Sequence, residues 1–404
     1  MTRVAHAPLG ELMATKTGSV DPSKYQDEVF DLYSIPAFDR GAPEVADGSA
    51  IGSAKQVVEP QDVLLSKIVP HIRRAWVVGD DRGRRLIASG EWIVFRSLRA
   101  EPGYLRQVLR SDPFHVQFMQ TVAGVGGSLL RARPAQVARI SIPLPPLPEQ
   151  RRIAAILDQA DALRAKRREA LAQLDSLTQS IFIEMFGDPV INPSAWELTP
   201  FGSVGTLDRG VSKARPRNAP ELLGGPYPLI QTGDVANCNG YIRQHTATYS
   251  EAGLRQSKLW PAGTLCITIA ANIAKTGILT FAACFPDSVV GFSAAQPATV
   301  EYVRVWLSFL QKALEDAAPE SAQKNINLAI LRSLTIPVPP LALQQVFATR
   351  IQAVESLKAT HRAALAESNA LFASLQHRAF AGQLSAGQRP AAFATIAPCA
   401  PPTP

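Results

Sequence analysis

Four cysteines and the lack of a long apolar run set the first limits on this 404-residue chain. No two cysteines are close enough for a CxxC pair, so we expect reduced, unpaired thiols rather than a disulfide framework. The longest apolar stretch, Leu265–Ala274, is interrupted by Thr268 and Asn272 and is far shorter than the ~20 residues of a membrane span. The first residues lack the apolar core of a secretory signal. We expect a soluble, cytoplasmic chain with no membrane partner and with two or three domains.

Sequence signatures of enzymes are also missing. There is no Gly-x-x-x-x-Gly-Lys-Ser/Thr phosphate loop, no Gly-x-Gly-x-x-Gly after a strand, and no Asn-Pro-Pro-Tyr/Phe of amino-methyltransferases. The six histidines form no close array, so we expect no metal site. These absences predict a chain that performs no catalysis of its own and holds no cofactor.

Basic residues exceed acidic residues by 41 to 34, which gives a net charge of +7. No basic tail accounts for the excess, because residues 25–139 and 197–337 each carry a net charge of only +2. The positive groups gather in short runs at 71–74, 82–85, 131–133 and 213–217. Such runs suit contacts with a polyanion, and a solvated loop is the alternative for each of them.

An internal repeat organises the chain. IPLPPL at 142–147 recurs as IPVPPL at 336–341, an offset of 194 residues. The match continues without a gap and gives 16 identities in 50 positions between 138–187 and 332–381. We interpret the chain as a duplicated unit in which a variable block is followed by one shared segment.

Each shared segment predicts a long helix after an extended proline run, because prolines lack backbone donors and restrain the residues before them. Apolar residues then recur at steps of three and four, and Gly187 and Gly382 favour the left-handed conformation that ends a helix. At about 36–40 residues, each helix would be roughly 55–60 Å long. The predicted apolar seams comprise Ile153, Ile156, Ala160, Leu163, Ala170, Leu174, Leu177 and Ile181 in the first helix, and Phe347, Val354, Leu357, Ala364, Leu371 and Leu375 in the second.

Two such seams in one chain bury each other most simply as an antiparallel pair. Under pseudo-twofold pairing, Arg167 and His361 at the seam midpoints would meet; the alternative is that both turn outward to solvent or to a partner. The variable blocks predict α+β folds with short strands. The predicted strands are Val63–Ile68, Ala75–Val78, Trp92–Phe95, Thr264–Ile269 and Gly277–Phe281.

With the repeat laid out, the chain resembles the specificity subunit of a type I restriction-modification system. The resemblance rests on IPLPPLPEQRRI at 142–153, on the long helix that follows and on MFGDP at 185–189. The second copy fits less closely, because Leu343-Gln344-Gln345 replaces Pro-Glu-Gln. The resemblance covers about residues 25–384 and is weaker inside the variable blocks.

This resemblance implies an α+β fold with an internal pseudo-twofold repeat, in which two globular target-recognition domains are separated by two long antiparallel conserved helices, a coiled-coil pair. Each domain would read one half of an asymmetric, bipartite double-stranded DNA target. The helices would set the unread gap and dock two methyltransferase (modification) subunits, and a restriction-translocase subunit would join the assembly. S-adenosylmethionine, ATP and magnesium would belong to those partners, and this chain would be a non-catalytic subunit.

The implied domains follow the repeat along the chain. Residues 1–24 form an N-terminal extension, 25–141 the first target-recognition domain, 142–189 the first spacer helix, 196–335 the second target-recognition domain, 336–384 the second spacer helix, and 385–404 a disordered tail.

Candidate DNA contacts lie in polar loops of both blocks. Gly-Ser-x-Lys at 52–55 and Val-Ser-Lys at 211–213 resemble loops that the family uses at DNA, and Arg, Lys, Asn and Gln can contact phosphates or base edges. A structural or solvated role is the alternative for each residue. The candidates are Ser53, Lys55, Lys67, Arg73 and Arg74 in the first domain, and Ser212, Lys213, Arg215, Arg217, Thr232, Gln323, Lys324 and Asn325 in the second.

Two other functions are open from the sequence. One is the specificity subunit of a related bipartite system whose partner fuses methylase and nuclease. The other is a non-catalytic coiled-coil scaffold whose two heads bind proteins. Sequence-dependent DNA binding that weakens steeply with salt would argue against the scaffold.

Overall fold

The computed structural model describes residues 4–124, 130–270, 273–317 and 326–384. The chain divides into two compact units, of which unit 1 contains residues 1–167 and 364–404, and unit 2 contains residues 168–363. Both boundaries fall inside long helices, α5 (Leu147–Phe186) and α11 (Leu341–Phe380). Each unit therefore contains the first part of one long helix and the last part of the other.

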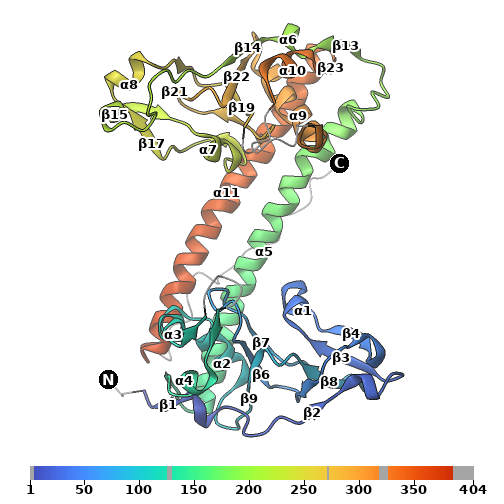
Figure 1. Ribbon diagram of the computed structural model, residues 1–404, viewed down its shortest axis with the longest axis vertical. Coiled ribbons are helices and arrows are strands. Elements are labelled where there is room, and N and C mark those ends of the chain that lie inside the picture. Colours follow the sequence, from blue (N-terminus) through green and yellow to red (C-terminus); the bar gives the residue numbers. More distant parts are fainter. Residues whose placement is uncertain (1–3, 125–129, 271–272, 318–325, 385–404) are drawn as a thin grey trace, which may run out of the picture. The chain divides into compact units, whose positions relative to one another are not determined.

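Unit 1 combines two main sheets with short helices (Figure 1). Its strands are β1 (His6–Pro8), β2 (Ser19–Val20), β3 (Val29–Tyr33), β4 (Glu44–Asp47), β5 (Lys55–Val57), β6 (Val63–Ser66), β7 (Ala75–Val77), β8 (Arg85–Ala88), β9 (Trp92–Phe95), β10 (Val122–Ala123), β11 (Arg131–Ala132) and β12 (Ser141–Pro143). Its shorter helices are η1 (Leu9–Glu11), η2 (Pro22–Lys24), α1 (Ile35–Arg40), η3 (Gly48–Ala50), α2 (Pro102–Leu109), α3 (Asp112–Met119) and α4 (Pro134–Val137). The larger sheet has the order β2-β5-β8-β3-β4, with β3 and β8 parallel, and the smaller antiparallel sheet has the order β7-β6-β9. Antiparallel pairs β1-β12 and β10-β11 complete the unit.

Unit 2 has the same kind of organisation (Figure 1). Its strands are β13 (Glu197–Pro200), β14 (Thr206–Arg209), β15 (Leu223–Leu229), β16 (Gly240–Ile242), β17 (Ala247–Tyr249), β18 (Leu259–Trp260), β19 (Leu265–Thr268), β20 (Thr276–Leu279), β21 (Ala283–Cys284), β22 (Val289–Ser293) and β23 (Thr335–Val338). Its shorter helices are α6 (Phe201–Val204), η4 (Pro220–Leu222), α7 (Thr232–Ala236), α8 (Glu251–Arg255), α9 (Pro297–Ala317) and α10 (Leu328–Ser333). The sheets have the orders β14-β22-β19-β20-β16 and β17-β15-β21-β18, and β13 pairs with β23.

The predicted strands are all present, with ends that differ by one or two residues. The β6 and β19 strands each lie between two antiparallel neighbours, β7 and β9 for the first and β20 and β22 for the second. Residues 4–24, which the sequence analysis set apart as an extension, contribute strand β1 and the fully buried Leu9 and Leu12 to unit 1. Isolated apolar residues among glycine and proline carry no periodicity, so the sequence does not reveal this burial.

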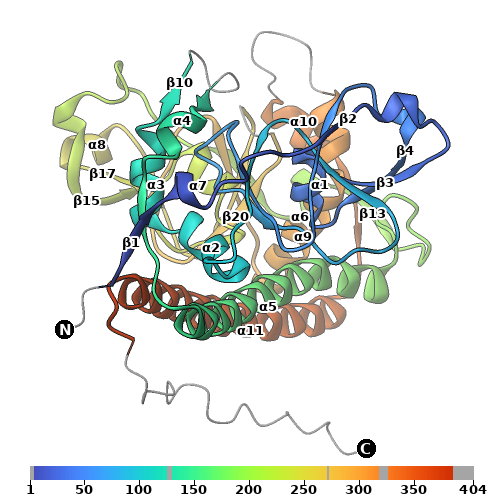
Figure 2. The same cartoon turned by 90° about the horizontal axis from the view of Figure 1, so that it is seen from below.

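The long helices have the predicted length, since α5 and α11 contain 40 residues each. The residues after them, Gly187 and Gly382, have φ angles of 78° and 70°, as a left-handed helix end requires. Figures 1 and 2 show α5 and α11 side by side.

In both units the helices run antiparallel. In unit 1, Arg152 donates to the carbonyl of Leu384, and Arg164 bonds Asn369.

In unit 2, Lys358 pairs with Asp175 and Arg350 with Glu184, so rising numbers on α5 again meet falling numbers on α11. The suggested meeting of Arg167 with His361 joins residues of different units and stays a prediction.

The buried faces of α5 and α11 repeat with the offset of 194 residues. Ile153, Leu157 and Ala160 of α5 are buried, and so are their counterparts Phe347, Ile351 and Val354. The predicted seams are wrong at two places, because Leu177 and Leu357 are 39% and 52% exposed. The neighbouring Thr178 and Lys358 are buried instead. Two overlapping heptad series can be drawn through this sequence. The series that is buried contains basic residues, so the sequence alone does not indicate that it is the buried one.

A polar contact is duplicated with the same offset. In unit 1, Arg164 contacts Asp161 Oδ1 at 2.9 Å and donates to Asn369 Oδ1 at 2.7 Å. In unit 2, Lys358 Nζ lies 3.1 Å from Glu355 Oε1 and 2.9 Å from Asp175 Oδ1. All three positions, 161/355, 164/358 and 175/369, are related by 194 residues. The internal pseudo-twofold repeat therefore extends to individual side-chain contacts.

Two further buried side chains in each unit anchor the proline run to the recognition block. Gln150 Nε2 donates to the Pro145 carbonyl at 2.7 Å, and Gln344 Nε2 donates to the Pro339 carbonyl at 2.9 Å. Tyr104 and Tyr302 donate their hydroxyls to the carbonyls of Pro143 and Pro337, at 2.8 and 2.6 Å. These side chains supply hydrogen-bond donors to carbonyls of the extended proline run. The following helix is thereby fixed to its block.

The cores of both units include residues from both long helices. In unit 1, Ile153 and Leu157 of α5 and Leu375 and Ala379 of α11 lie in one cluster with α2 and the smaller sheet. The core of unit 2 includes Phe182 and Phe186 of α5 and Phe347 of α11, and Phe182 stacks on Tyr302 of α9 at 5.3 Å between ring centroids.

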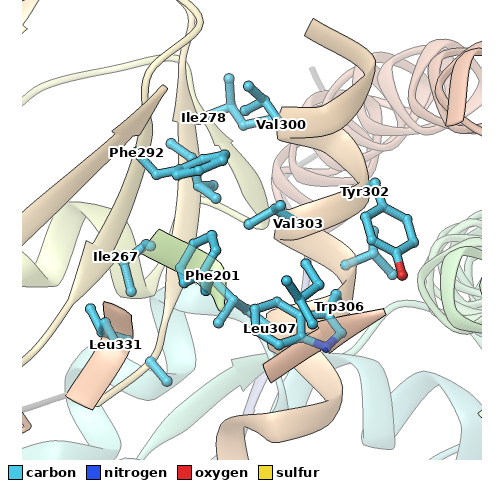
Figure 3. Packing of buried hydrophobic residues seen from close by; sticks show 14 of the residues in the cluster. Phe201, Ile267, Ile278, Phe292, Val300, Tyr302, Val303, Trp306, Leu307 and Leu331 are labelled. Atoms are coloured by element: carbon cyan, nitrogen blue, oxygen red, sulfur yellow. The ribbon is translucent and has the colours of Figure 1, made fainter. Parts of the chain in front are cut away.

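On its other face, α9 packs against the sheet of unit 2. Figure 3 shows Val303 and Leu307 turned toward Phe201 and Phe292, with Tyr302 on the opposite side of the helix. None of the helices in the described part of the chain has an apolar stretch long enough to cross a membrane.

Candidate nucleic-acid interface

The loop at residues 211–218 of unit 2, between β14 and η4, is held in a defined conformation. Gln256 Oε1 accepts hydrogen bonds from the backbone N–H groups of Lys213 at 2.7 Å and Ala214 at 3.0 Å. Ser257 Oγ donates to the Val211 carbonyl at 2.7 Å. At the start of the loop, a Cβ on Gly210 would lie 2.3 Å from the Pro286 carbonyl oxygen, so only glycine allows this approach. The 211–218 loop is thus preorganised by residues distant in the sequence.

Three arginines converge on one residue beside this loop. Arg217 Nη2 lies 2.6 Å from Asp287 Oδ1, and Arg215 Nη2 lies 3.8 Å from Asp287 Oδ2. Arg209 donates to the main-chain carbonyl of Asp287 from Nε at 2.9 Å and from Nη2 at 2.8 Å. All three arginines are exposed. Arg209, Arg215 and Arg217 are here named the basic cluster. They offer three guanidinium groups to solvent around one residue, two of them at its carboxylate and one at its main-chain carbonyl, a pattern that suits phosphate contacts.

A pocket of about 330 Å³ opens beside the basic cluster. Its lining mixes apolar and polar side chains, with Ser212, Arg217, Asn218, Gln231, Thr232 and Ser288 supplying the polar ones. Ser212 is 6% exposed, and its Oγ has no hydrogen-bond partner among the described residues. Hydroxyl, amide and guanidinium groups among apolar side chains are the kinds of group that contact the edges of DNA bases.

A second hollow of about 550 Å³ is lined by other residues in and near the short helix α7, and Gln231 lines both. Asn237, Asn239, Gln244 and His245 line it together with two arginines, Arg243 and Arg362. Arg243 pairs with Glu355 of α11 at 3.0 Å, so α11 is linked to this hollow. The polar side chains of this face are of the types that contact phosphates and base edges.

The structure brings together part of the predicted set in unit 2. Ser212, Arg217 and Thr232 line one pocket, and Lys213 and Arg215 lie in the same loop. Gln323, Lys324 and Asn325 lie outside the described residues.

The predicted residues of unit 1 are more dispersed. Lys55 on β5 donates to Ser53 Oγ at 2.6 Å, and partial burial lowers the pKa of Lys55. Lys67 follows β6 and is half-buried. Arg73 pairs with Asp112 beside α3. These four residues are at least partly accessible and stay candidates.

Arg74 has a different environment from the rest of the predicted set. It is 8% exposed and binds Asp39 through Nε and Nη2, both at 2.8 Å. These hydrogen bonds hold the pKa of Asp39 below its ordinary value. Arg74 therefore has an internal structural partner, and the geometry favours the structural alternative for it.

Sequence reasoning missed several residues of the unit 2 face. Arg209, Asn218, Gln231, Asp287 and Ser288 were not predicted, because none of them belongs to a run of basic residues. Gly210, next to Arg209, carries the one usable signal, since a glycine at the end of a strand indicates a close backbone approach.

The described residues contain no group of three or more His, Cys, Asp or Glu side chains placed to hold a metal ion. Their three cysteines, Cys238, Cys266 and Cys284, are unpaired, and burial raises the pKa of each thiol. The chemistry that this face offers is hydrogen bonding and charge.

Comparison with known proteins agrees with this geometry. The family model for the type I restriction modification DNA specificity domain matches residues 114–173 and 193–367, more than half of the chain. A protein of Methanocaldococcus jannaschii, named as the specificity subunit of the type I restriction enzyme MjaX, is similar to this chain. It is 23% identical over 272 residues, which cover 64% of this chain and 62% of that protein. The EcoKI specificity subunit of Escherichia coli K12 is 23% identical over 316 residues, which cover 71% of this chain and 66% of that protein. The matches thus span slightly less than two thirds of these relatives.

The fold has counterparts among solved structures. A chain from a structure that concerns complex assembly and conformational transition of the type I restriction-modification system aligns with a TM-score of 0.57 and 23% identity. The alignment covers 95% of this chain and 99% of that one. The chain belongs to the family of type I restriction modification DNA specificity domains.

Proposed function

We propose that this chain is the DNA-recognition subunit of a type I restriction-modification complex. The observation that carries the proposal is the basic cluster on the preorganised 211–218 loop, next to a pocket of polar side chains. Phosphate contacts from the cluster would fix the position of unit 2 on the duplex. Polar side chains of the pocket would then face base edges and supply sequence dependence.

Each recognition block would read one half of a bipartite target. Ser53, Lys55, Lys67 and Arg73 are the candidate contacts of unit 1, and they differ in kind and placement from the set in unit 2. Because the two faces differ, the two half-sites should differ and the target should be asymmetric.

The long helices would set the gap between half-sites and dock two methyltransferase subunits. Apolar side chains outside the buried seam of unit 2 support this, since Leu177, Ile183, Val346 and Leu357 are 39–52% exposed. A restriction-translocase subunit would complete the complex in the cytoplasm. S-adenosylmethionine, ATP and magnesium would bind to those partners, and this chain would supply only the recognition of the DNA sequence.

The deciding experiment maps DNA methylation across the source genome with and without this gene. Loss of one gapped, two-part methylated motif is the expected result, and it would also identify both half-sites. Loss of a contiguous motif would mean that only one block reads DNA. An unchanged methylation pattern, together with failure of the purified chain to bind a neighbouring methyltransferase, would contradict the proposal.

The scaffold alternative predicts a different dependence on salt. A protein that contacts several phosphates loses affinity steeply as salt rises, because each contact releases counterions. Binding of genomic DNA fragments that is unaffected between 50 and about 200 mM salt would favour the scaffold over the recognition subunit.

A further inference from the structure

Asp287 contacts all three arginines of the basic cluster, two of them through its carboxylate. Its two oxygens are turned to Arg217 at 2.6 Å and to Arg215 at 3.8 Å. Arginine guanidinium groups bind carboxylates and phosphates with the same forked geometry. The carboxylate of Asp287 therefore occupies a position in which a phosphate oxygen could receive the same hydrogen bonds.

The two partners of this contact, the arginines and Asp287, differ in how firmly they are held. On one side, Arg215 also donates from Nη1 to the carbonyls of Ser212 and Ala214, each at 2.8 Å, so its guanidinium is oriented by the 211–218 loop. On the other side, the main chain of Asp287 is fixed by Arg209, while its side chain is 36% exposed. A rotation of the Asp287 side chain toward solvent would release the arginines without any movement of the backbone.

The charge balance favours such a displacement. Arg215 and Arg217 face one carboxylate, which leaves a net charge of +1 when Asp287 is in place and +2 when it has turned away. Arg209, which binds the main-chain carbonyl of Asp287, adds a third positive charge nearby. A DNA phosphate that arrives at the cluster would restore the balance that the carboxylate provides in the free chain. The contact with Asp287 is partly exposed, so breaking it costs little.

We propose that Arg215 and Arg217 form a binding site for one phosphate of the DNA backbone, and that Asp287 occupies this site until DNA displaces it. The inference rests on the proposed function and adds the ligand group, the two residues that hold it and the residue that competes for it. Asp287 lowers the affinity for DNA, because every binding event must first displace its carboxylate.

The test compares Asp287→Asn with a matched control, Asp208→Asn. Asp208 is also a partly exposed aspartate of unit 2, and it contacts two basic residues loosely, Lys258 at 3.8 Å and Arg332 at 3.7 Å. Each variant removes one negative charge and keeps the shape of the side chain. Binding of a labelled, mixed-sequence 40-base-pair duplex to the full chain would be measured by fluorescence anisotropy at several salt concentrations.

We expect Asp287→Asn to bind the duplex about three- to tenfold more tightly than the parent chain, with a steeper salt dependence, and Asp208→Asn to differ by less than about twofold. The gain should vanish when Arg217→Ala is combined with Asp287→Asn, because the site then lacks one of its two arginines. Unfolding curves of all variants would verify that each one is folded.

Two results would overturn the inference while the proposed function stands: the parent chain binds DNA but Asp287→Asn binds equally or more weakly, or Asp208→Asn gains as much affinity as Asp287→Asn. In the first case Asp287 would orient the arginines rather than compete with DNA. In the second case the gain would be a general charge effect. If the parent chain and all variants fail to bind DNA, the proposed function fails and this inference fails with it.

Discussion

Gln256 determines the conformation of the 211–218 loop through one atom. Its Oε1 accepts the N–H groups of Lys213 and Ala214, whereas its Nε2 has no partner in the part of the chain that the structure describes. Gln256→Glu keeps the acceptor, and Gln256→Met keeps the length of the side chain but removes it. We expect the amides of residues 213 and 214 to exchange with solvent about fivefold faster in Gln256→Met, since each lost hydrogen bond is worth ~1 kcal/mol.

Hydrogen exchange measured by NMR on the free chain would follow these two amides without any need for DNA. Gln256→Glu should exchange like the parent chain, and it serves as the control for the change at this position. Equal exchange in Gln256→Met and the parent would show that the loop is held by its other contacts.

At single residues, what could be predicted depends on whether neighbours in space are neighbours in sequence. Lys213, Arg215 and Arg217 form a short basic run, so the sequence alone identified them. Asp287 and Gln256 act on the same loop from 38 to 76 positions away. Arg74 belongs to a similar basic run, yet it is buried against Asp39, because charge composition does not distinguish a salt bridge from a contact surface.

For the helices, the sequence predicted length, ends, repetition and part of the buried face, but not the polar positions that are buried. The proline runs and the terminal glycines are local signals, and both helices begin and end close to the expected residues. The buried face depends on contacts between distant segments. Lys358 is buried, against the usual expectation for lysine, since Asp175 and Glu355 satisfy its charge.

The duplicated polar contact offers a matched pair of variants. Lys358→Met and Arg164→Met remove equivalent cations from the two copies and keep an apolar stem of similar length. Lys358 is the more buried of the two, with a side chain 5% exposed against 18% for Arg164. We expect Lys358→Met to lower the free energy of unfolding by about 1–3 kcal/mol, because Glu355 then keeps only its contacts with Arg243 and Arg362.

Arg164→Met should have a smaller effect than Lys358→Met, below about 1 kcal/mol, because the contacts of Arg164 are more exposed to solvent. Urea unfolding followed by circular dichroism would measure both. A larger loss for Arg164→Met than for Lys358→Met would show that burial does not set the strength of these contacts.

On the scale of the whole molecule, the sequence repeat and the compact units divide the chain at different places. The repeat predicts a block followed by its own helix, whereas each unit also includes the end of the other helix. Phe182 and Phe186 lie at the end of the first shared segment, yet they pack in unit 2. A linear domain map could not anticipate this, because the exchange of helix ends becomes visible only when the two helices are paired.

Because each unit contains the end of the other long helix, we predict that the chain ends can be moved by circular permutation without loss of the fold. In unit 1, Gly382 packs against Val4, which lies just before β1; in unit 2, Gly187 packs against Pro193, which lies just before β13. In unit 2, the chain itself joins Gly187 to Pro193 and runs through the exposed Val190 and Ile191. In unit 1, Gly382 and Val4 are neighbours in space without such a link. A circular permutant that joins residue 384 to residue 4 through a short Gly/Ser linker and opens between Val190 and Ile191 should therefore fold, because exposed loops tolerate new termini.

We expect this permutant to keep the helical circular dichroism of the parent and to unfold within about 2 kcal/mol of it. The control opens α5 between Arg167 and Arg168, where the break interrupts a helix that contributes to both cores, and it should lose most of its helical signal or its cooperative transition. If the loop permutant fails to fold while the helix permutant folds, the continuity of α5 is dispensable and the 187–196 connection is not. That outcome would contradict the equivalence of the two connections on which the prediction rests.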